Sequence, residues 1–157
     1  MITANLRQPF KWAFLVPIIW AVAVSSSGAA DLAADDKPFA EAHIVLQLSD
    51  ADEKRQSIVL NVANNLIKYY GGPDMVDLEI VAFGPGISLL YKDSANAERI
   101  ASLAANGIRF VACTNTLDTI ERTTGTRPEL GPYAQSVQAG VAHLVERSGQ
   151  GFTIIRP

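Results

Sequence analysis

The chain has 157 residues and a formal net charge of −3, from 13 basic and 16 acidic residues. The basic residues are scattered singly, which argues against a nucleic-acid partner or an anionic membrane surface, because both require clustered cations. Cys113 is the one cysteine, so an internal disulfide framework is excluded.

The first 30 residues have the pattern of an export signal. Arg7 and Lys11 precede an apolar run over residues 12–24, and small residues follow as far as Asp31. This pattern is typical of a secretory signal peptide over residues 1–30, and the run is shorter than a membrane span requires. An uncleaved anchor is the alternative. We therefore predict a periplasmic or secreted protein with no stable membrane insertion after cleavage.

A polar leader is expected over residues 31–42, without an apolar period. Branched apolar residues then predict a strand over 43–48 that is buried on both faces. Apolar side chains at three- and four-residue steps predict a helix over 53–70, which glycines end. Residues 75–83 predict a second strand.

A glycine-rich turn follows this second strand. Gly84, Pro85 and Gly86 can let the backbone approach a ligand, although a tight strand-to-helix turn is the simpler explanation. Their spacing matches neither a Walker loop nor a dinucleotide fingerprint. A helix over 97–104 and a third strand over 108–112 are expected next.

Cys113 lies where the third strand should end. Thr114, Asn115 and Thr116 follow it and offer turn and helix-cap chemistry. A cysteine at a helix N-terminus can have a lowered pKa, and strand alternation places Arg109 on the same face of the strand as the thiol. Cys113 is therefore a candidate reactive thiol. Inert burial and a bond to another chain are the alternatives.

Residues 114–131 are mostly polar and are expected to be irregular, with a short helix over 117–122. A last helix over 138–147 and a closing strand over 152–156 follow. The alternation of strands and helices predicts a single α/β domain over residues 43–157, with a mostly parallel sheet between two helical layers, as in flavodoxin-like folds.

The sequence gives little indication of serine-type or metal-dependent catalysis. The two histidines, His43 and His143, lie far apart in the sequence, and we expect His143 to be exposed or half-buried. No Ser-His-Asp arrangement and no metal-ligand spacing is evident, so we expect neither a metal nor a cofactor. Cys113 is thus the one side chain with a plausible reactive role, by attack on an activated sulfur or by formation of a persulfide.

Three segments resemble the DsrE/DsrF-like family: residues 80–86, residues 107–116, and the end of the chain from 140–147 to 155–157. The resemblance implies a compact parallel α/β domain that commonly forms homo-oligomers. In the sulfur-handling members a single cysteine carries sulfane sulfur as a persulfide, and that role could fall only on Cys113. An export signal is a departure from the cytoplasmic sulfur-relay members.

Two functional hypotheses follow. The first is a periplasmic sulfur-carrier or thiol-relay protein, in which Cys113 bears the persulfide and exchanges sulfur with a small donor or a thiol protein partner. Residues 114–116, Arg109 and the turn over residues 84–86 would support the thiolate and shape its pocket. The second is a non-catalytic oligomeric binding or assembly module with a buried structural cysteine. Whether the protein is an enzyme stays open.

Overall fold

The computed structural model describes residues 37–157. The predicted signal peptide and the first part of the predicted leader lie outside the described residues. The elements are β1 (Ala42–Leu48), α1 (Glu53–Tyr69), η1 (Pro73–Met75), β2 (Val76–Ala82), η2 (Gly84–Leu90), α2 (Ala97–Ala105), β3 (Arg109–Cys113), α3 (Thr114–Thr124), β4 (Ala134–Val137), α4 (Gly140–Gly149) and β5 (Thr153–Ile155).

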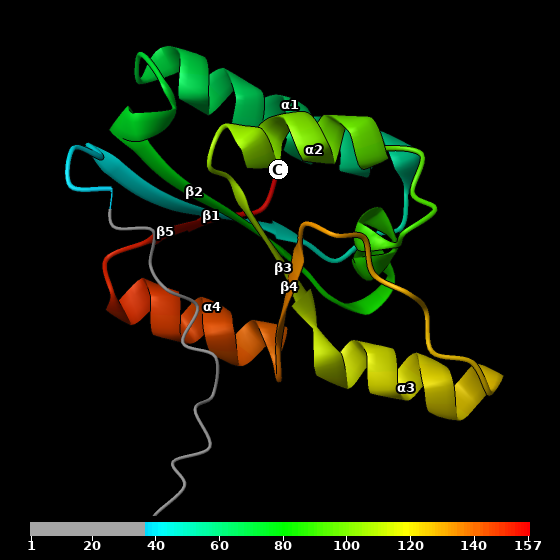
Figure 1. Cartoon of the computed structure of the whole chain (residues 1–157). Helices are drawn as coiled ribbons and strands as arrows, with labels where there is room; N and C mark the ends of the chain where they lie inside the picture. The colour runs from blue at the N-terminus through cyan, green and yellow to red at the C-terminus, as the bar shows by residue number, and fades with distance from the viewer. Residues whose placement is uncertain (1–36) are drawn as a thin grey trace, which may run out of the picture. The chain divides into compact units, whose positions relative to one another are not determined.

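The described strands form one five-stranded sheet in the order β4-β3-β2-β1-β5, and every neighbouring pair is parallel (Figure 1). This confirms the predicted α/β fold. Leu48 pairs with Ala82, and Ala82 pairs with Ala112, so the carboxyl ends of β1, β2 and β3 coincide. Cys113 pairs with Val137 at the same edge. The topology therefore gathers the segments after four strands at one edge of the sheet.

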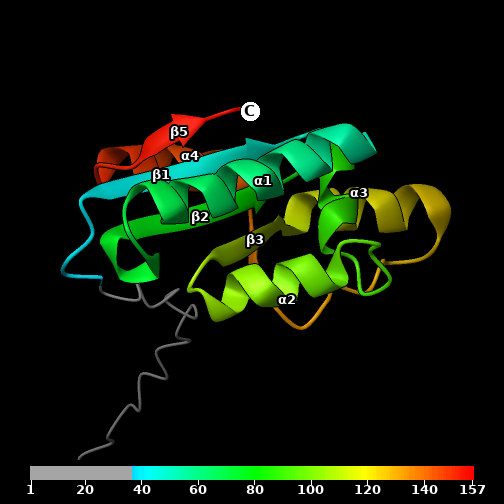
Figure 2. The ribbon, with the colours of Figure 1, turned by 90° about the horizontal axis from the view of Figure 1, so that it is seen from above.

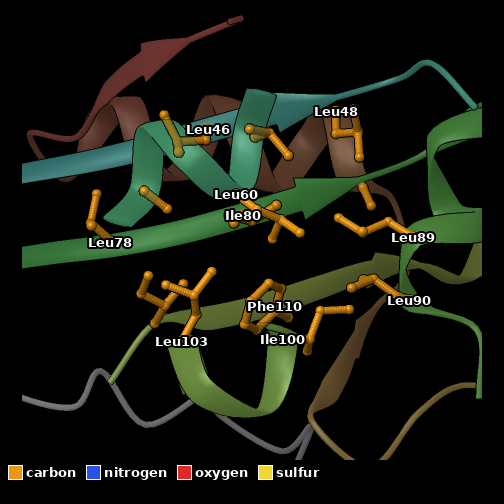
Figure 3. Packing of buried hydrophobic residues seen from close by; sticks show 14 of the residues in the cluster. Leu46, Leu48, Leu60, Leu78, Ile80, Leu89, Leu90, Ile100, Leu103 and Phe110 are labelled. Carbon is orange, nitrogen blue, oxygen red and sulfur yellow. The ribbon is translucent and has the colours of Figure 1, made fainter. Parts of the chain in front are cut away.

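Helices α1 and α2 cover one face of the sheet, and α4 covers the other (Figures 1 and 2). Strand alternation assigns even-numbered residues of β1, β2 and β3 to the first face and odd-numbered residues to the second. Figure 3 shows the larger core, on the α1 and α2 side. The side chains labelled there are Leu46, Leu48, Leu60, Leu78, Ile80, Leu89, Leu90, Ile100, Leu103 and Phe110.

The face beneath α4 has a smaller apolar cluster. Val45, Val81 and Val111 from the three central strands pack there with Leu144 of α4 and Phe152. Charged side chains occupy the rest of that face toward the amino ends of the strands. Helix α4 therefore makes apolar contacts at the centre of this face and ionic contacts at its charged end.

Two elements differ from the sequence-based expectation. Residues 114–131 were expected to be irregular apart from a short helix over 117–122, but the helix is longer: α3 occupies Thr114–Thr124, and only Leu117 of it is buried. Helix α3 extends past the carboxyl end of β3, away from the core (Figures 1 and 2). Such a helix has few buried apolar side chains, so its sequence shows little of the apolar periodicity that predicts a helix. Strand β4 was missed because it is a short edge strand whose sequence, AQSV, lacks a run of apolar residues.

The described end of the predicted leader is attached to the domain. The ammonium group of Lys37 donates hydrogen bonds to the carbonyls of Pro73 (2.8 Å), Val76 (3.2 Å) and Gly107 (3.1 Å). These carbonyls lie at the amino-terminal side of the sheet, opposite Cys113. Within residues 37–157, the helices are too short or too polar to cross a membrane.

Gly86 offers a test of the packing at the carboxyl edge. A Cβ atom there would lie 2.6 Å from the carbonyl oxygen of Leu48 and 3.0 Å from the amide nitrogen of Asp50. Because these are backbone atoms, we expect Gly86→Ala to lower the free energy of unfolding by about 1–3 kcal/mol. Urea unfolding of Gly149→Ala provides the control, since a Cβ there meets no atom within 4 Å. Equal stability of the two variants would contradict the packing described.

Candidate functional site

Cys113 lies at the junction of two helix N-termini. It is the last residue of β3 and the N-cap of α3. From the neighbouring strand β4 the chain turns into α4, and Gly140, the first residue of α4, approaches closely. A Cβ atom on Gly140 would lie 3.2 Å from the Cβ atom of Cys113. Glycine at this position therefore permits the contact between α4 and the cysteine.

Four hydrogen-bond donors near the sulfur of Cys113 favour its thiolate. They are the hydroxyl of Thr116 and the backbone N–H groups of Gly140, Thr116 and Asn115. Burial disfavours the thiolate, but these donors outweigh it and lower the pKa of Cys113 below its ordinary value of 9.0. The sulfur thus lies beside the N-terminal N–H groups of both α3 and α4. A stabilised thiolate is the chemical consequence.

Thr116 connects the cysteine to the glycine turn. The N–H of Gly84 donates a 3.0 Å hydrogen bond to the Thr116 hydroxyl oxygen, and this hydroxyl donates to the sulfur. Gly84 has a φ of 53°, in the left-handed region where glycine is favoured. Gly86 packs instead against the backbone after β1. The structure therefore brings Gly84 and Thr116 to the thiol, while Gly86 supports the turn.

An open cleft of about 520 Å³ lies beside this network. Its lining is mostly apolar and includes four of the residues singled out from the sequence. The lining residues are Gly84, Pro85, Tyr91, Asn115, Thr116, Thr119 and Ile120. Thr116 thus lies on the wall of the cleft and against the sulfur.

Cys113 itself is only 6% exposed. The segment before α4 covers it: the Gln138 side chain donates a 2.7 Å hydrogen bond to the Asn115 side chain, and the Asn115 N–H donates to the Gln138 carbonyl at 3.0 Å. The thiol of Cys113 donates a weak hydrogen bond to that same carbonyl oxygen, with a sulfur-to-oxygen distance of 3.9 Å. Thr114, the first residue of α3, is half-buried. A reagent therefore has two routes to the sulfur. Either residue 138 moves aside, or the reagent enters from the cleft past Thr116.

Arg109 is not part of the thiol's surroundings. It shares the α4 face with Cys113, as alternation predicts, but the two residues lie at opposite ends of β3. Four residues of strand separate their Cα atoms by about 13 Å. The guanidinium of Arg109 pairs instead with Glu79 (3.3 Å) and Asp77 (2.7 Å). The suggestion that Arg109 supports the thiolate is therefore corrected by the geometry.

Arg109 belongs to a buried ionic cluster that was not recognised from the sequence. At its centre is Glu79 of β2, whose side chain is 0% exposed. His143 binds one carboxylate oxygen of Glu79. The other oxygen accepts hydrogen bonds from Arg109 (3.3 Å) and Arg147 (3.1 Å).

His143 is thus buried, not exposed or half-buried as predicted from the sequence. The reason is that His143 and Arg147, one turn apart on α4, both face Glu79. The signal was the combination of acids at alternating positions of β2, Asp77 and Glu79, with a histidine and an arginine at i and i+4. All seven residues of β2 are buried, so both acids lie on a strand that is covered on its two faces.

The cluster shifts the ionisation of its members. Burial raises the pKa of Glu79, but the hydrogen bond from His143 and the charges of His143, Arg147 and Arg109 outweigh it, so the pKa of Glu79 is lowered. Burial lowers the pKa of Arg109, and its pairing with Asp77 and Glu79 more than offsets this effect, so the pKa is raised. Both groups are charged in the folded protein at neutral pH.

Among residues 37–157, no group of three or more histidine, cysteine, aspartate or glutamate side chains has an arrangement that could hold a metal ion. The Glu79 cluster is saturated with cationic side chains.

The fold and the site define a parallel α/β protein with a cysteine at the carboxyl end of a strand, where two helices begin. No family model and no curated protein matches the chain. Among solved structures it is similar to one titled "Structure of Protein of Unknown Function MTH1491 from Methanobacterium thermoautotrophicum". The sequence identity is 30%, the match covers 74% of this chain and 100% of the other, and the TM-score is 0.66. The chain belongs to the same family as MTH1491.

The hydroxyl of Thr116 can be tested directly. We expect Thr116→Val to raise the pKa of Cys113 and to slow its alkylation at pH 7 by about tenfold, because a hydrogen bond to a charged group is lost. Thr116→Ser should retain the wild-type pH profile. Thr123→Val is the matched control, since the Thr123 hydroxyl bonds only within α3, to the carbonyl of Thr119. A wild-type profile in Thr116→Val would contradict the assigned donor.

Glu79 makes the stability depend on pH. Its pKa is lower in the folded state than its ordinary value of 4.5, so its contribution is present above that value and is lost as the pH falls through the folded pKa. At neutral pH we expect Glu79→Gln to lower the free energy of unfolding by about 3–5 kcal/mol, because buried cations lose their partner. Urea unfolding across pH should show this difference narrowing in acid. A difference independent of pH would contradict the assignment.

Proposed function

We propose that the protein is a sulfur-carrier or thiol-relay protein, in which Cys113 accepts sulfane sulfur as a persulfide and passes it to a second thiol. The observation that carries this proposal is the convergence of four hydrogen-bond donors on one sulfur. An inert cysteine in an apolar core needs no such donors, whereas a thiolate nucleophile does. The resemblance of residues 107–116 to the DsrE/DsrF-like family supports the same role.

The chemistry needs no external oxidant when the donor is a persulfide or polysulfide. The Cys113 thiolate attacks the outer sulfur of the donor, and a new sulfur–sulfur bond forms as the donor's own bond breaks. The donor leaves as a thiolate with the electron pair. Transfer to an acceptor thiolate repeats the exchange and regenerates the Cys113 thiolate. The donors around the sulfur stabilise the anion before and after each step.

Access to the sulfur favours a small donor or an accepting thiol on a flexible segment. The cleft beside Thr116 has a mostly apolar lining and contains no charged side chain. The hydrogen bonds between Asn115 and Gln138 close the other approach. A donor entering by the cleft would pass Thr116, whereas a partner protein could displace residue 138.

Export and self-association complete the proposal. The predicted signal peptide over residues 1–30 supports a periplasmic or secreted location. Val141 and Val145 on α4 are 57% and 68% exposed, and they lie one turn apart on the side of the helix away from the sheet. Such an apolar pair supports the proposed homo-oligomer.

The alternative is a non-catalytic binding or assembly module. The 6% exposure of Cys113 favours it, as does the absence of the cysteine from the lining of the cleft. In that case the exposed apolar side chains of α4 would be the functional surface. The two proposals differ in whether Cys113 exchanges sulfur.

The deciding experiment exposes the folded protein to inorganic polysulfide and measures its intact mass. We expect an added mass of one or more sulfur atoms that dithiothreitol removes, and no addition to Cys113→Ser. Transfer to a small thiol should then return the protein to its original mass. If the wild-type protein gains no sulfur while folded, but does so once denatured, the carrier proposal fails and the binding module is favoured.

A further inference from the structure

Helix α4 contacts two parts of the sheet that lie far apart. At its start, Gly140 packs so closely that a Cβ atom on it would lie 3.2 Å from the Cβ of Cys113 and 3.3 Å from the Cβ of Phe83. Farther along the same inward side, His143 and Arg147 bind Glu79. One face of a single helix therefore contacts both the candidate reactive sulfur and the buried carboxylate.

The apolar contacts of α4 alone define its position only loosely. Leu144 is its one buried apolar side chain beyond Gly140, and Val141 and Val145 face away from the sheet. Apolar packing is non-directional, so it does not by itself fix how far the helix extends along the strands. The bonds to Glu79 are directional, and the carboxylate is fixed in β2 with Arg109 beside it.

Small displacements of α4 matter at its start. The N–H of Gly140 is one of the donors to the sulfur of Cys113, and hydrogen bonds weaken steeply when distance or angle changes. Seven residues of helix separate Gly140 from Arg147, a rise of about 10 Å. A helix is stiff over this length, so a shift at its charged end moves its start as well.

We propose that Glu79 is a positioning residue for Cys113: by binding His143 and Arg147, it holds α4 where the N–H of Gly140 faces the sulfur. The role rests on the proposed thiol chemistry of Cys113 and extends it to a residue outside the pocket. The groups that face Glu79 are Arg109, His143 and Arg147, and Asp77 with His43 continues the cluster toward the surface.

The direct electrostatic effect of Glu79 has the opposite sign, which makes the proposal testable. Glu79 pairs with Arg109 in the sheet register, four residues before Cys113, or about 13 Å along the strand. Removing a negative charge at that distance would favour the thiolate and lower the pKa of Cys113. A displacement of α4 would instead remove a hydrogen-bond donor from the sulfur and raise the pKa of Cys113. The direction of the change therefore separates the two effects.

The experiment measures the alkylation rate of Cys113 against pH in the folded full-length chain. For Glu79→Gln we expect the pKa of Cys113 to rise and the rate at pH 7 to fall by about three- to tenfold, in keeping with the weakening of one charge-assisted hydrogen bond. Glu129→Gln is the matched control, because it removes an exposed carboxylate that pairs only with Lys92. Its profile should equal that of the wild-type protein.

A second variant keeps the charge. Glu79→Asp shortens the side chain by one methylene, so the carboxylate remains but cannot hold α4 in the same place. Circular dichroism shows whether each variant is folded. If Glu79→Gln does not fold, the pKa of Cys113 in Glu79→Asp tests the positioning role. A raised pKa of Cys113 in the folded variant supports the positioning role. An unchanged or lowered pKa overturns it.

The failure of this inference is distinguishable from the failure of the proposed function. If the wild-type protein accepts sulfur from polysulfide but the Glu79 variants label like wild type, only the positioning role is wrong. If the wild-type protein accepts no sulfur, the carrier proposal is wrong, and the pKa of Cys113 in the variants still tests the link between Glu79 and α4.

Discussion

A fully buried carboxylate, Glu79, is the constraint on which the α4 side of the structure depends. An ionised carboxylate in a protein interior is costly unless cations and hydrogen-bond donors surround it. Arg109 supplies one cation from β3, Arg147 supplies another from α4, and His143 of α4 adds a hydrogen bond. A helix without His143 and Arg147 would leave this carboxylate with Arg109 but without the two partners that α4 supplies. The sheet therefore specifies which helix covers this face and where that helix lies.

The site follows from this arrangement and from the parallel topology. Parallel strands place their carboxyl ends at one edge, and each chain segment leaving that edge starts a helix or a turn. At Cys113 this brings two helix N-termini to one sulfur, with the Thr116 hydroxyl between the sulfur and the Gly84 turn. The cysteine is buried, yet its surroundings are polar and favour the anion. This combination distinguishes it from a thiol that only fills space in an apolar core.

Much of the fold could be predicted from the sequence, because β1, β2 and β3 have long apolar runs and α1, α2 and α4 have periodic apolar faces. Strand β4 escaped prediction and α3 was predicted only over residues 117–122, since each has few buried side chains and its full extent depends on tertiary context. At the site, Cys113, Thr116 and Gly84 were recognised because their residue types have local turn and cap chemistry. The Glu79 cluster was missed because its members are separated by up to 68 residues and meet only after the sheet and α4 have packed.

Both the sulfur chemistry and the positioning role of Glu79 require that the folded protein holds Cys113 as a stabilised thiolate. The most direct test is an ultraviolet titration of the folded wild-type protein, with Cys113→Ser subtracted so that the thiolate absorbance stands apart from that of the tyrosines. We expect a transition below the ordinary thiol value of 9.0. A transition at or above that value would contradict a stabilised thiolate, because burial would then outweigh the donors that converge on the sulfur.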